Sequence, residues 1–231
     1  MYEDSLKGFY TWLKDTNLNS NLASEMTQNA LIRRIAPIVE QRVFDVSGKS
    51  MVKAEKLLTP GNVSVFRLDE IKNSMVERIL VFHVINKIAS VKLRDYKNDF
   101  PPVMFLIDEA HNFFPRYLHD QQEKAYVYRA IRLMERATKE GRKFKLRLEF
   151  STQSPEDLHP SVIKTVNTIT LFGCTSVQAS NLKKVINLPI NASELTTLPS
   201  REAIVFSREN SSLPIKILVP WPLLTHPLSK S

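Results

Sequence analysis

Cysteine, glycine and long apolar runs are scarce in this chain of 231 residues, and each shortage excludes a class of protein. A single cysteine, Cys174, cannot form an intrachain disulfide, which is typical of a protein in a reducing compartment. The longest apolar stretches are about six residues, far short of the ~20 needed to cross a bilayer. The acidic, polar N-terminus does not resemble a secretory signal. We therefore expect a cytoplasmic protein without a membrane span.

The shortage of glycine bears on phosphate binding. A phosphate-binding loop of the pattern G-x-x-x-x-G-K-[ST] uses glycines to let backbone N–H groups approach the phosphates. Residues 47–50, SGKS, copy the end of this pattern, but position 43 is valine and residues 39–46 contain no glycine. Lys49 is better interpreted as part of a solvated turn. The sequence predicts no complete phosphate-binding loop within these residues.

What remains is the composition of one globular domain, with 43% hydrophobic residues, 24% charged residues and a net charge of +8. The positive charge favours polyanionic partners. Strands alternate with helices along the chain, which predicts an α/β fold with a mostly parallel sheet flanked by helices and an N-terminal helical segment. The expected helices lie in residues 1–46, 69–92, 122–139 and 177–185, and the expected strands are 63–68, 103–107, 145–152, 168–172, 203–206 and 215–219.

Two adjacent carboxylates follow the apolar strand VMFLI of residues 103–107, which we expect to be buried on both faces. They lie at its carboxyl end, where open α/β sheets bind ligands. In nucleotide hydrolases this arrangement is the Walker B element. Its first acid, here Asp108, supports Mg²⁺, usually through water, and its second, here Glu109, orients or deprotonates the attacking water. The alternative is an ordinary strand followed by a helix capped by acids.

Two downstream positions extend this candidate site. Gly141 is suited to the left-handed end of a helix, and Arg142 and Lys143 lie where cations favour the helix dipole. Arg142 has a second interpretation, as a side chain that acts on a γ-phosphate bound by a neighbouring subunit. The strand of residues 145–152 leads to Gln153, at the edge expected to carry the two acids. Gln153 either holds water and senses the γ-phosphate, or is simply a polar residue that leaves a strand.

Four blocks of sequence resemble the HerA/FtsK superfamily of ring ATPases, and HerA, its DNA-translocating branch, is the nearest match. The resemblance covers roughly residues 20–220 and rests on PGNVSV (60–65), FLIDEAHNFFP (105–115), EGRKF (140–144) and STQSPEDL (151–158). It implies a RecA-like P-loop NTPase core, assembly into a hexamer, Mg²⁺ and ATP as ligands, and ATP-driven movement of double-stranded DNA. It also implies a partner similar to the nuclease NurA, in the processing of DNA ends.

The resemblance assigns roles residue by residue. Asp108 matches the Walker B aspartate, Glu109 the catalytic glutamate, Arg142 the arginine finger and Gln153 the polar sensor. The expected domains are a helical segment (1–58), a partial RecA-like core (59–219) and an extended tail (220–231). The family's phosphate loop would lie upstream of residue 1. The chain then resembles a C-terminal portion, whether an excised piece, a natural truncation or a subunit that lost its loop, and by itself is expected to be inactive.

The strand before Gln153 departs from the family pattern, because Lys145, Arg147 and Glu149 make one face of it charged. That face is expected to meet solvent, a subunit or DNA. Lys143, Lys145 and Arg147 are candidate DNA contacts, although a basic cluster is often only a solvated face. The second functional class is therefore a non-catalytic subunit that builds a ring or binds DNA without its own nucleotide site.

Two further interpretations of residues 108–111 are weaker. DEAH also spells the box of DEAH-type helicases, but the Ser/Thr-Ala-Thr strand that follows the box in that class is not visible in the sequence. A metal site built from Asp108, Glu109 and His111 is disfavoured, because adjacent strand residues point to opposite faces and no other cluster completes the shell. His111 is interpreted as a residue at a helix start that packs near the site.

Overall fold

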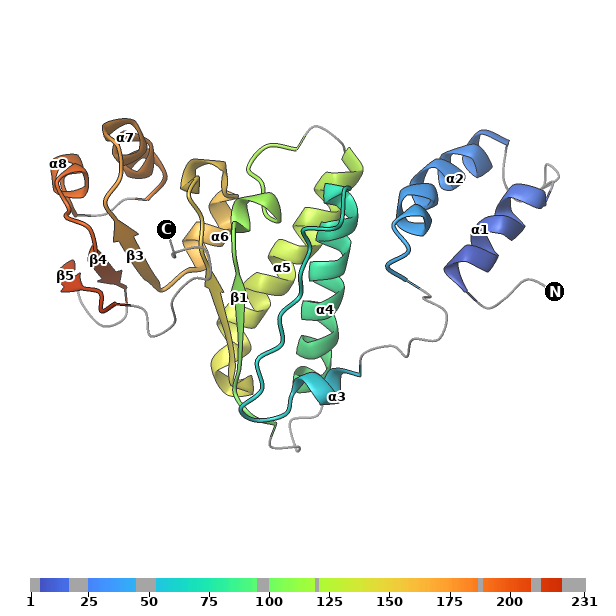
Figure 1. The fold of residues 1–231 in the computed structure, drawn as a ribbon, viewed down its shortest axis with the longest axis horizontal. Coiled ribbons are helices and arrows are strands. Elements are labelled where there is room, and N and C mark those ends of the chain that lie inside the picture. The colour runs from blue at the N-terminus through green and yellow to red at the C-terminus, as the bar shows by residue number, and fades with distance from the viewer. Residues whose placement is uncertain are drawn as a thin grey trace, which may run out of the picture. The chain divides into compact units, whose positions relative to one another are not determined.

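The computed structural model describes residues 5–16, 25–44, 53–94, 100–118, 121–186, 189–208 and 213–221. The side chains of residues 93–94, 121–123, 126 and 138–142 lie outside this description, as does the SGKS segment. The chain divides into two compact units, Met1–Phe105 with Glu140–Arg147 and Leu106–Lys139 with Leu148–Ser231. The elements, shown in Figure 1, are α1 (Leu6–Asp15), α2 (Glu25–Glu40), α3 (Ala54–Leu57), α4 (Ser74–Arg94), β1 (Val103–Ile107), η1 (Ala110–Asn112), α5 (Gln121–Phe144), β2 (Leu146–Phe150), η2 (Pro155–Asp157), α6 (Pro160–Thr165), β3 (Thr168–Phe172), α7 (Ser176–Val185), α8 (Ala192–Thr196), β4 (Glu202–Ser207) and β5 (Ile215–Leu218).

The first two helices form a pair (Figure 1). The apolar spacing along α1 places Leu13 on the inner side, where only 1% of it is exposed. The Gln28 side chain of α2 donates hydrogen bonds to the carbonyl oxygens of Leu13 (2.6 Å) and Thr16 (2.7 Å). Since the last carbonyls of a helix have no partner within it, Gln28 satisfies the end of α1 and joins the two helices.

Helix α4 begins later than the sequence indicated. Asn73 caps it, because its Oδ1 accepts hydrogen bonds from the backbone N–H groups of Met75 (3.0 Å) and Val76 (3.2 Å). Asp69, the first residue of the helix that the sequence predicts over 69–92, does not cap it but forms an ion pair with Arg67 at 2.6 Å. Apolar residues lie on nearly all sides of α4, and Val76 is fully buried.

Helix α5 continues past the position expected to end it. It runs through Gly141 to Phe144, so the interpretation of Gly141 as a left-handed cap was wrong. The left-handed residue is Lys145, with φ of 53°, directly before β2. A glycine inside a helix costs roughly 0.5–1 kcal/mol, and the hydrogen bonding of the long helix outweighs this cost.

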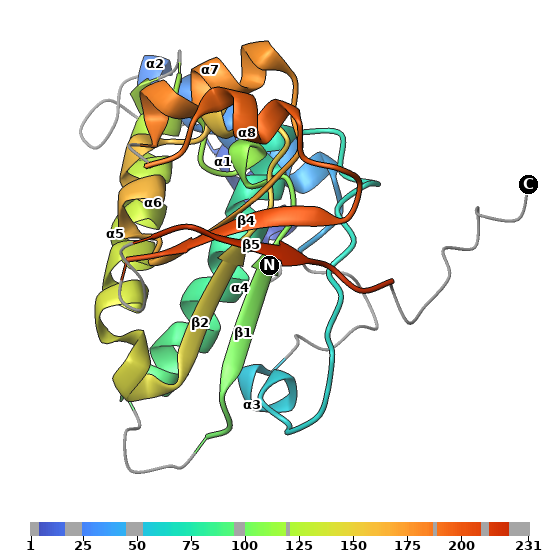
Figure 2. The ribbon, with the colours of Figure 1, turned by 90° about the vertical axis from the view of Figure 1, so that its left-hand side faces the viewer.

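Strands β1 and β2 pair in a two-stranded parallel sheet. Val103 donates its N–H to the carbonyl of Lys145 (2.9 Å), and Ser151 donates to the carbonyl of Ile107 (3.0 Å). The partners advance together along both strands, so the strands are parallel and end at the same edge (Figure 2). The expected α/β class with a parallel sheet is confirmed.

Two other expectations about strands were wrong. Residues 63–68 form no strand, and Val63 and Val65 are 89% and 79% exposed. Strand β1 is not buried on both faces, since Met104 and Leu106 are 52% and 70% exposed. An alternating sequence forms a strand only where a neighbour supplies hydrogen bonds, and within the described residues β1 pairs with β2 alone.

The three C-terminal strands form a second sheet in the order β3-β4-β5. These strands are antiparallel, with Thr170 opposite Val205 and Val205 opposite Ile215, so they do not extend the parallel sheet that the sequence led us to expect. The loop between β4 and β5 is too short for the crossover that parallel strands require. Gly173 follows β3 at a point of close contact, where a Cβ would lie 2.9 Å from the carbonyl oxygen of Leu198. Among the described residues, no helix has the length and apolar character needed to cross a membrane.

Candidate functional site

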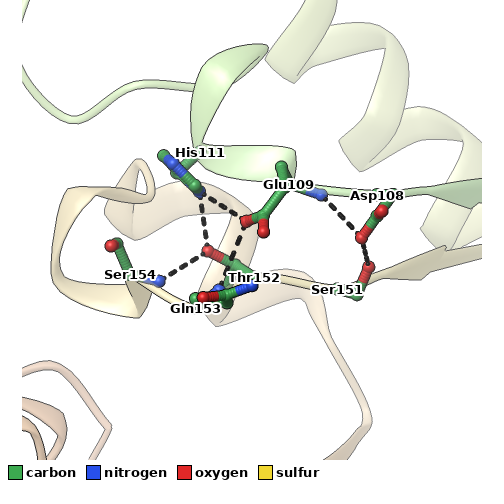
Figure 3. Close-up of polar contacts among 7 residues, drawn as sticks. All are labelled: Asp108, Glu109, His111, Ser151, Thr152, Gln153 and Ser154. Carbon is green, nitrogen blue, oxygen red and sulfur yellow. Dashed lines mark hydrogen bonds and ion pairs between the residues drawn. The ribbon is translucent and has the colours of Figure 1, made fainter. Parts of the chain in front are cut away.

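The candidate site lies at the carboxyl edge of the parallel pair, within the unit that begins at Leu106. Asp108 and Glu109 directly follow the buried Ile107 at the end of β1, and residues 151–154 follow β2. Because both strands end at this edge, seven polar residues from the two loops meet in Figure 3. The pairing of the two strands thus fixes where the polar loops begin.

Asp108 is held in place by two hydrogen bonds to one of its oxygens. Its Oδ1 accepts from the Ser151 hydroxyl (2.5 Å) and from the backbone N–H of Glu109 (3.0 Å). The residue is nevertheless exposed, so its carboxylate remains accessible to water and ions. The arrangement restrains the position of the acid without burying it.

Glu109 has a left-handed backbone, with φ of 46° and ψ of 50°. This region is sparsely populated by residues other than glycine, and such conformations cluster at functional sites. The turn directs the Glu109 carboxylate away from Asp108 and toward the loop after β2 (Figure 3). Its Oε2 lies 3.3 Å from Nδ1 of His111 and 3.4 Å from the backbone nitrogen of Gln153. Two adjacent acids therefore have different partners.

His111 links the two loops. It lies in the short helix η1, and its Nδ1 is also 2.9 Å from the hydroxyl of Thr152, which accepts a hydrogen bond from the N–H of Ser154 (3.1 Å). An ionised carboxylate only accepts hydrogen bonds, so we infer that Nδ1 of His111 carries the hydrogen shared with Glu109 and Thr152. His111 thus contacts the acid directly, a closer role than packing near the site.

The sequence did not identify Ser151, Thr152 and Ser154 as members of this site. They could have been found in the sequence, because they are hydroxyl residues at the end of a strand expected to lie parallel to the strand that bears the acids. Gln153 does lie beside Glu109, but its backbone nitrogen makes the contact, whereas its side chain is exposed. The structure therefore places Gln153 beside Glu109 through its backbone, and the sensor role stays a prediction.

The roles of the remaining predicted residues are not tested by this network. The side chain of Arg142 falls outside the described residues. Lys143, Lys145 and Arg147 are exposed and belong to the other compact unit. Their exposure is compatible with contact to a phosphate backbone, and their role stays a prediction.

The donor set at the site suits a hard cation held mainly by water. Within the part of the chain that the structure describes, no cluster of three His, Cys, Asp or Glu side chains forms a protein cage for a metal. The accessible carboxylate of Asp108 and the hydroxyl of Ser151 are oxygen donors. Mg²⁺ prefers oxygen, keeps several waters and uses one or two carboxylates together with phosphates, so these residues fit Mg²⁺ with a bound nucleotide.

Comparisons with known proteins give one match in sequence and several in structure. No family model matches the chain. It is 30% identical over 154 residues, or 64% of its length, to "Probable helicase MJECL08" of Methanocaldococcus jannaschii, and spans 26% of that protein. It aligns with the genome packaging NTPase B204 from Sulfolobus turreted icosahedral virus 2 in complex with AMPPCP (TM-score 0.43, 20% identity, 61% of this chain and 62% of that one). The complex of that NTPase with ATP-gammaS aligns similarly (TM-score 0.43, 21% identity, 60% and 64%). The chain thus spans about a quarter of the helicase and under two thirds of the NTPase.

Proposed function

We propose that this chain is part of a HerA-like ATPase that uses ATP hydrolysis to move double-stranded DNA. One observation carries the proposal: Asp108 and Glu109 follow a parallel strand at its carboxyl edge and are held by different groups. An ATPase of the P-loop class needs two acids with different roles, one that holds the cation and one that orients the attacking water. An ordinary capped helix does not need them. The sequence match to a helicase supports the same class.

The residues divide the work of hydrolysis as follows. Asp108, fixed by Ser151, would hold Mg²⁺ through its water shell, and the cation would neutralise charge on the phosphates. Glu109 would orient a water and accept its proton at a carboxylate oxygen as the water attacks the γ-phosphorus. The bond from that phosphorus to the oxygen of the β-phosphate would break, so that ADP leaves with the bonding electrons. The backbone at Gln153 would sense the γ-phosphate through its contact with Glu109, and Arg142 would act on a neighbour's nucleotide.

The phosphate-binding loop would come from residues outside this sequence, since the chain contains no G-x-x-x-x-G-K-[ST] pattern. Self-association into a ring, with a hexamer as the expected form, would bring Arg142 to the next subunit. Double-stranded DNA is the proposed partner, and a nuclease similar to NurA would act with the assembly on DNA ends.

The missing loop also favours a second function. A subunit that builds a ring or binds DNA needs no phosphate loop, and the net charge of +8 would serve that function equally well. The acids would then be remnants of an active site. Salt-dependent affinity for DNA without nucleotide binding is the signature of this alternative.

The test measures MgATP binding and hydrolysis, with and without duplex DNA, for this chain and for the assembly isolated through an affinity tag on it. The variants are Glu109→Gln and the matched control Glu55→Gln, which removes the same charge from the exposed surface of α3. We expect DNA to stimulate hydrolysis by the assembly. Glu109→Gln should lower it by about 10²–10⁴, the usual contribution of a general base. Glu55→Gln should not change it.

The outcomes separate the two functions. Hydrolysis that survives Glu109→Gln would contradict the role assigned to this acid. An assembly that binds DNA but neither binds nor hydrolyses MgATP would support the non-catalytic subunit.

A further inference from the structure

An exposed row of arginines runs along α5, in the part of the helix that belongs to the same unit as the acids. Arg129, Arg132 and Arg136 are all exposed. At 3.6 residues per turn, spacings of three and four place them within an arc of about 60° around the helix. We call these three residues the α5 arginine stripe.

The core fixes the direction of the stripe. The opposite side of α5 is buried, with exposures of 1% to 3% at Val127, Ala130, Ile131, Met134 and Ala137. These residues also recur at helical spacing, so the helix cannot rotate without exposing them. Among the described side chains of α5 one is acidic, the half-buried Glu135, which borders the stripe. The stripe is therefore a fixed, one-sided line of positive charge.

We infer that the α5 arginine stripe binds the phosphate backbone of duplex DNA. The inference deepens the proposed function, because it assigns a surface to the proposed DNA partner, and it does not depend on hydrolysis. A rise of about 1.5 Å per residue places Arg129 and Arg136 about 10.5 Å apart along the helix. Successive phosphates of one strand advance by about 3.4 Å along the duplex axis, so the stripe matches about three of them.

The residue type supports phosphate as the ligand. The planar guanidinium of arginine offers paired N–H donors that match a phosphate, whereas lysine acts as a point charge. The cations between residues 127 and 137 of α5 are all arginines, with no lysine among them. This surface differs from Lys143, Lys145 and Arg147, which lie in the other unit. An acidic polypeptide is the competing ligand, and its carboxylates are not spaced as a rigid line.

The experiment measures binding of a fluorescent DNA duplex by the full chain, without nucleotide, at several salt concentrations. The test variant is Arg129→Gln with Arg132→Gln. The matched control is Arg33→Gln with Arg34→Gln, which removes two exposed arginines from another helix, α2, and changes the net charge equally. A third variant, Arg129→Lys with Arg132→Lys, keeps the charge and removes the paired donors.

We expect the test variant to weaken binding about tenfold or more and to lower the salt slope by about 1.8, since each phosphate contact contributes about 0.9. The control should bind like the wild type. The lysine variant should weaken binding with little change in slope. Surface substitutions of this kind change stability little, and urea unfolding checks that the variants are folded.

Three results would overturn the inference. Equal losses in test and control variants would mean that net charge alone attracts DNA, and the proposed function would stand. Competition by poly-glutamate as strong as that by unlabelled duplex would assign the stripe to acidic proteins. No binding of duplex by the wild type would remove both the inference and the DNA partner of the proposed function.

Discussion

The contact between His111 and Glu109 gives a prediction that needs no hydrolysis. If the ionised carboxylate of Glu109 lies 3.3 Å from Nδ1 of His111, that nitrogen must carry a hydrogen. We therefore expect the neutral His111 ring to be the Nδ1–H tautomer. Ring ¹⁵N chemical shifts distinguish the two tautomers in the folded chain.

Substitutions at His111 measure how much its contacts contribute to the free energy of unfolding. His111→Ala removes the contacts to Thr152 at 2.9 Å and to Glu109 at 3.3 Å. A hydrogen bond contributes about 0.5–1.5 kcal/mol, and the partly exposed contact with Glu109 lies at the low end of that range, so we expect a loss of about 1–2 kcal/mol in unfolding free energy. His111→Asn should recover most of this loss, because its amide N–H reaches the position of Nδ1. His111→Gln places the amide farther out and should not.

Urea unfolding of the three variants measures these differences, and a double-mutant cycle with Thr152→Val isolates the shared contact. A coupling energy near zero, or equal losses for Ala and Asn, would refute the network. So would a neutral ring protonated at Nε2. In the assembly, His111→Asn should also preserve hydrolysis better than His111→Ala does, if His111 positions Glu109.

Two further predictions concern folding. Burial lowers the pKa of His159 despite the opposing charge of Glu135, and its Nδ1 accepts the N–H of Ser161 at 3.2 Å as the cap of α6. The unfolded state then binds the proton more readily, so this contribution is complete above the unfolded pKa of about 6.5 and is lost as the pH falls below it. His159→Asn keeps a capping side chain and should remove this part of the pH dependence of unfolding free energy. Gly173→Ala places a Cβ 2.9 Å from the backbone oxygen of Leu198, and unfolding in urea should show a loss of about 1–3 kcal/mol; an unchanged midpoint would mean that the loop yields freely.

The sequence predicted the elements whose local pattern and tertiary partners agree. The helix expected at 177–185 is α7, and the strands expected at 168–172 and 203–206 are β3 and β4. Strands β3 and β4 pair with each other, and α7 buries Ala179 and Leu182. The acids at the end of β1 were predicted because they directly follow its apolar run.

The sequence could not show features that depend on residues far apart in the chain, or on which of two similar residues takes a role. Residues 63–68 alternate like a strand, but nothing in the sequence revealed that they lack a partner strand in the described structure. Asp69 and Asn73 are both good caps, and only the position of α4 selects Asn73. The Ser151 contact with Asp108 joins residues 43 positions apart, so no local pattern contains it.

The left-handed backbone of Glu109 has a consequence for how this position can vary. Glycine, asparagine and aspartate adopt that conformation at least cost, while β-branched residues clash there. Folding alone would therefore favour one of those three residues over glutamate at position 109. The cost of glutamate is offset only where its carboxylate is used, so a related chain with glycine or asparagine at this position is expected to keep the fold without the chemistry.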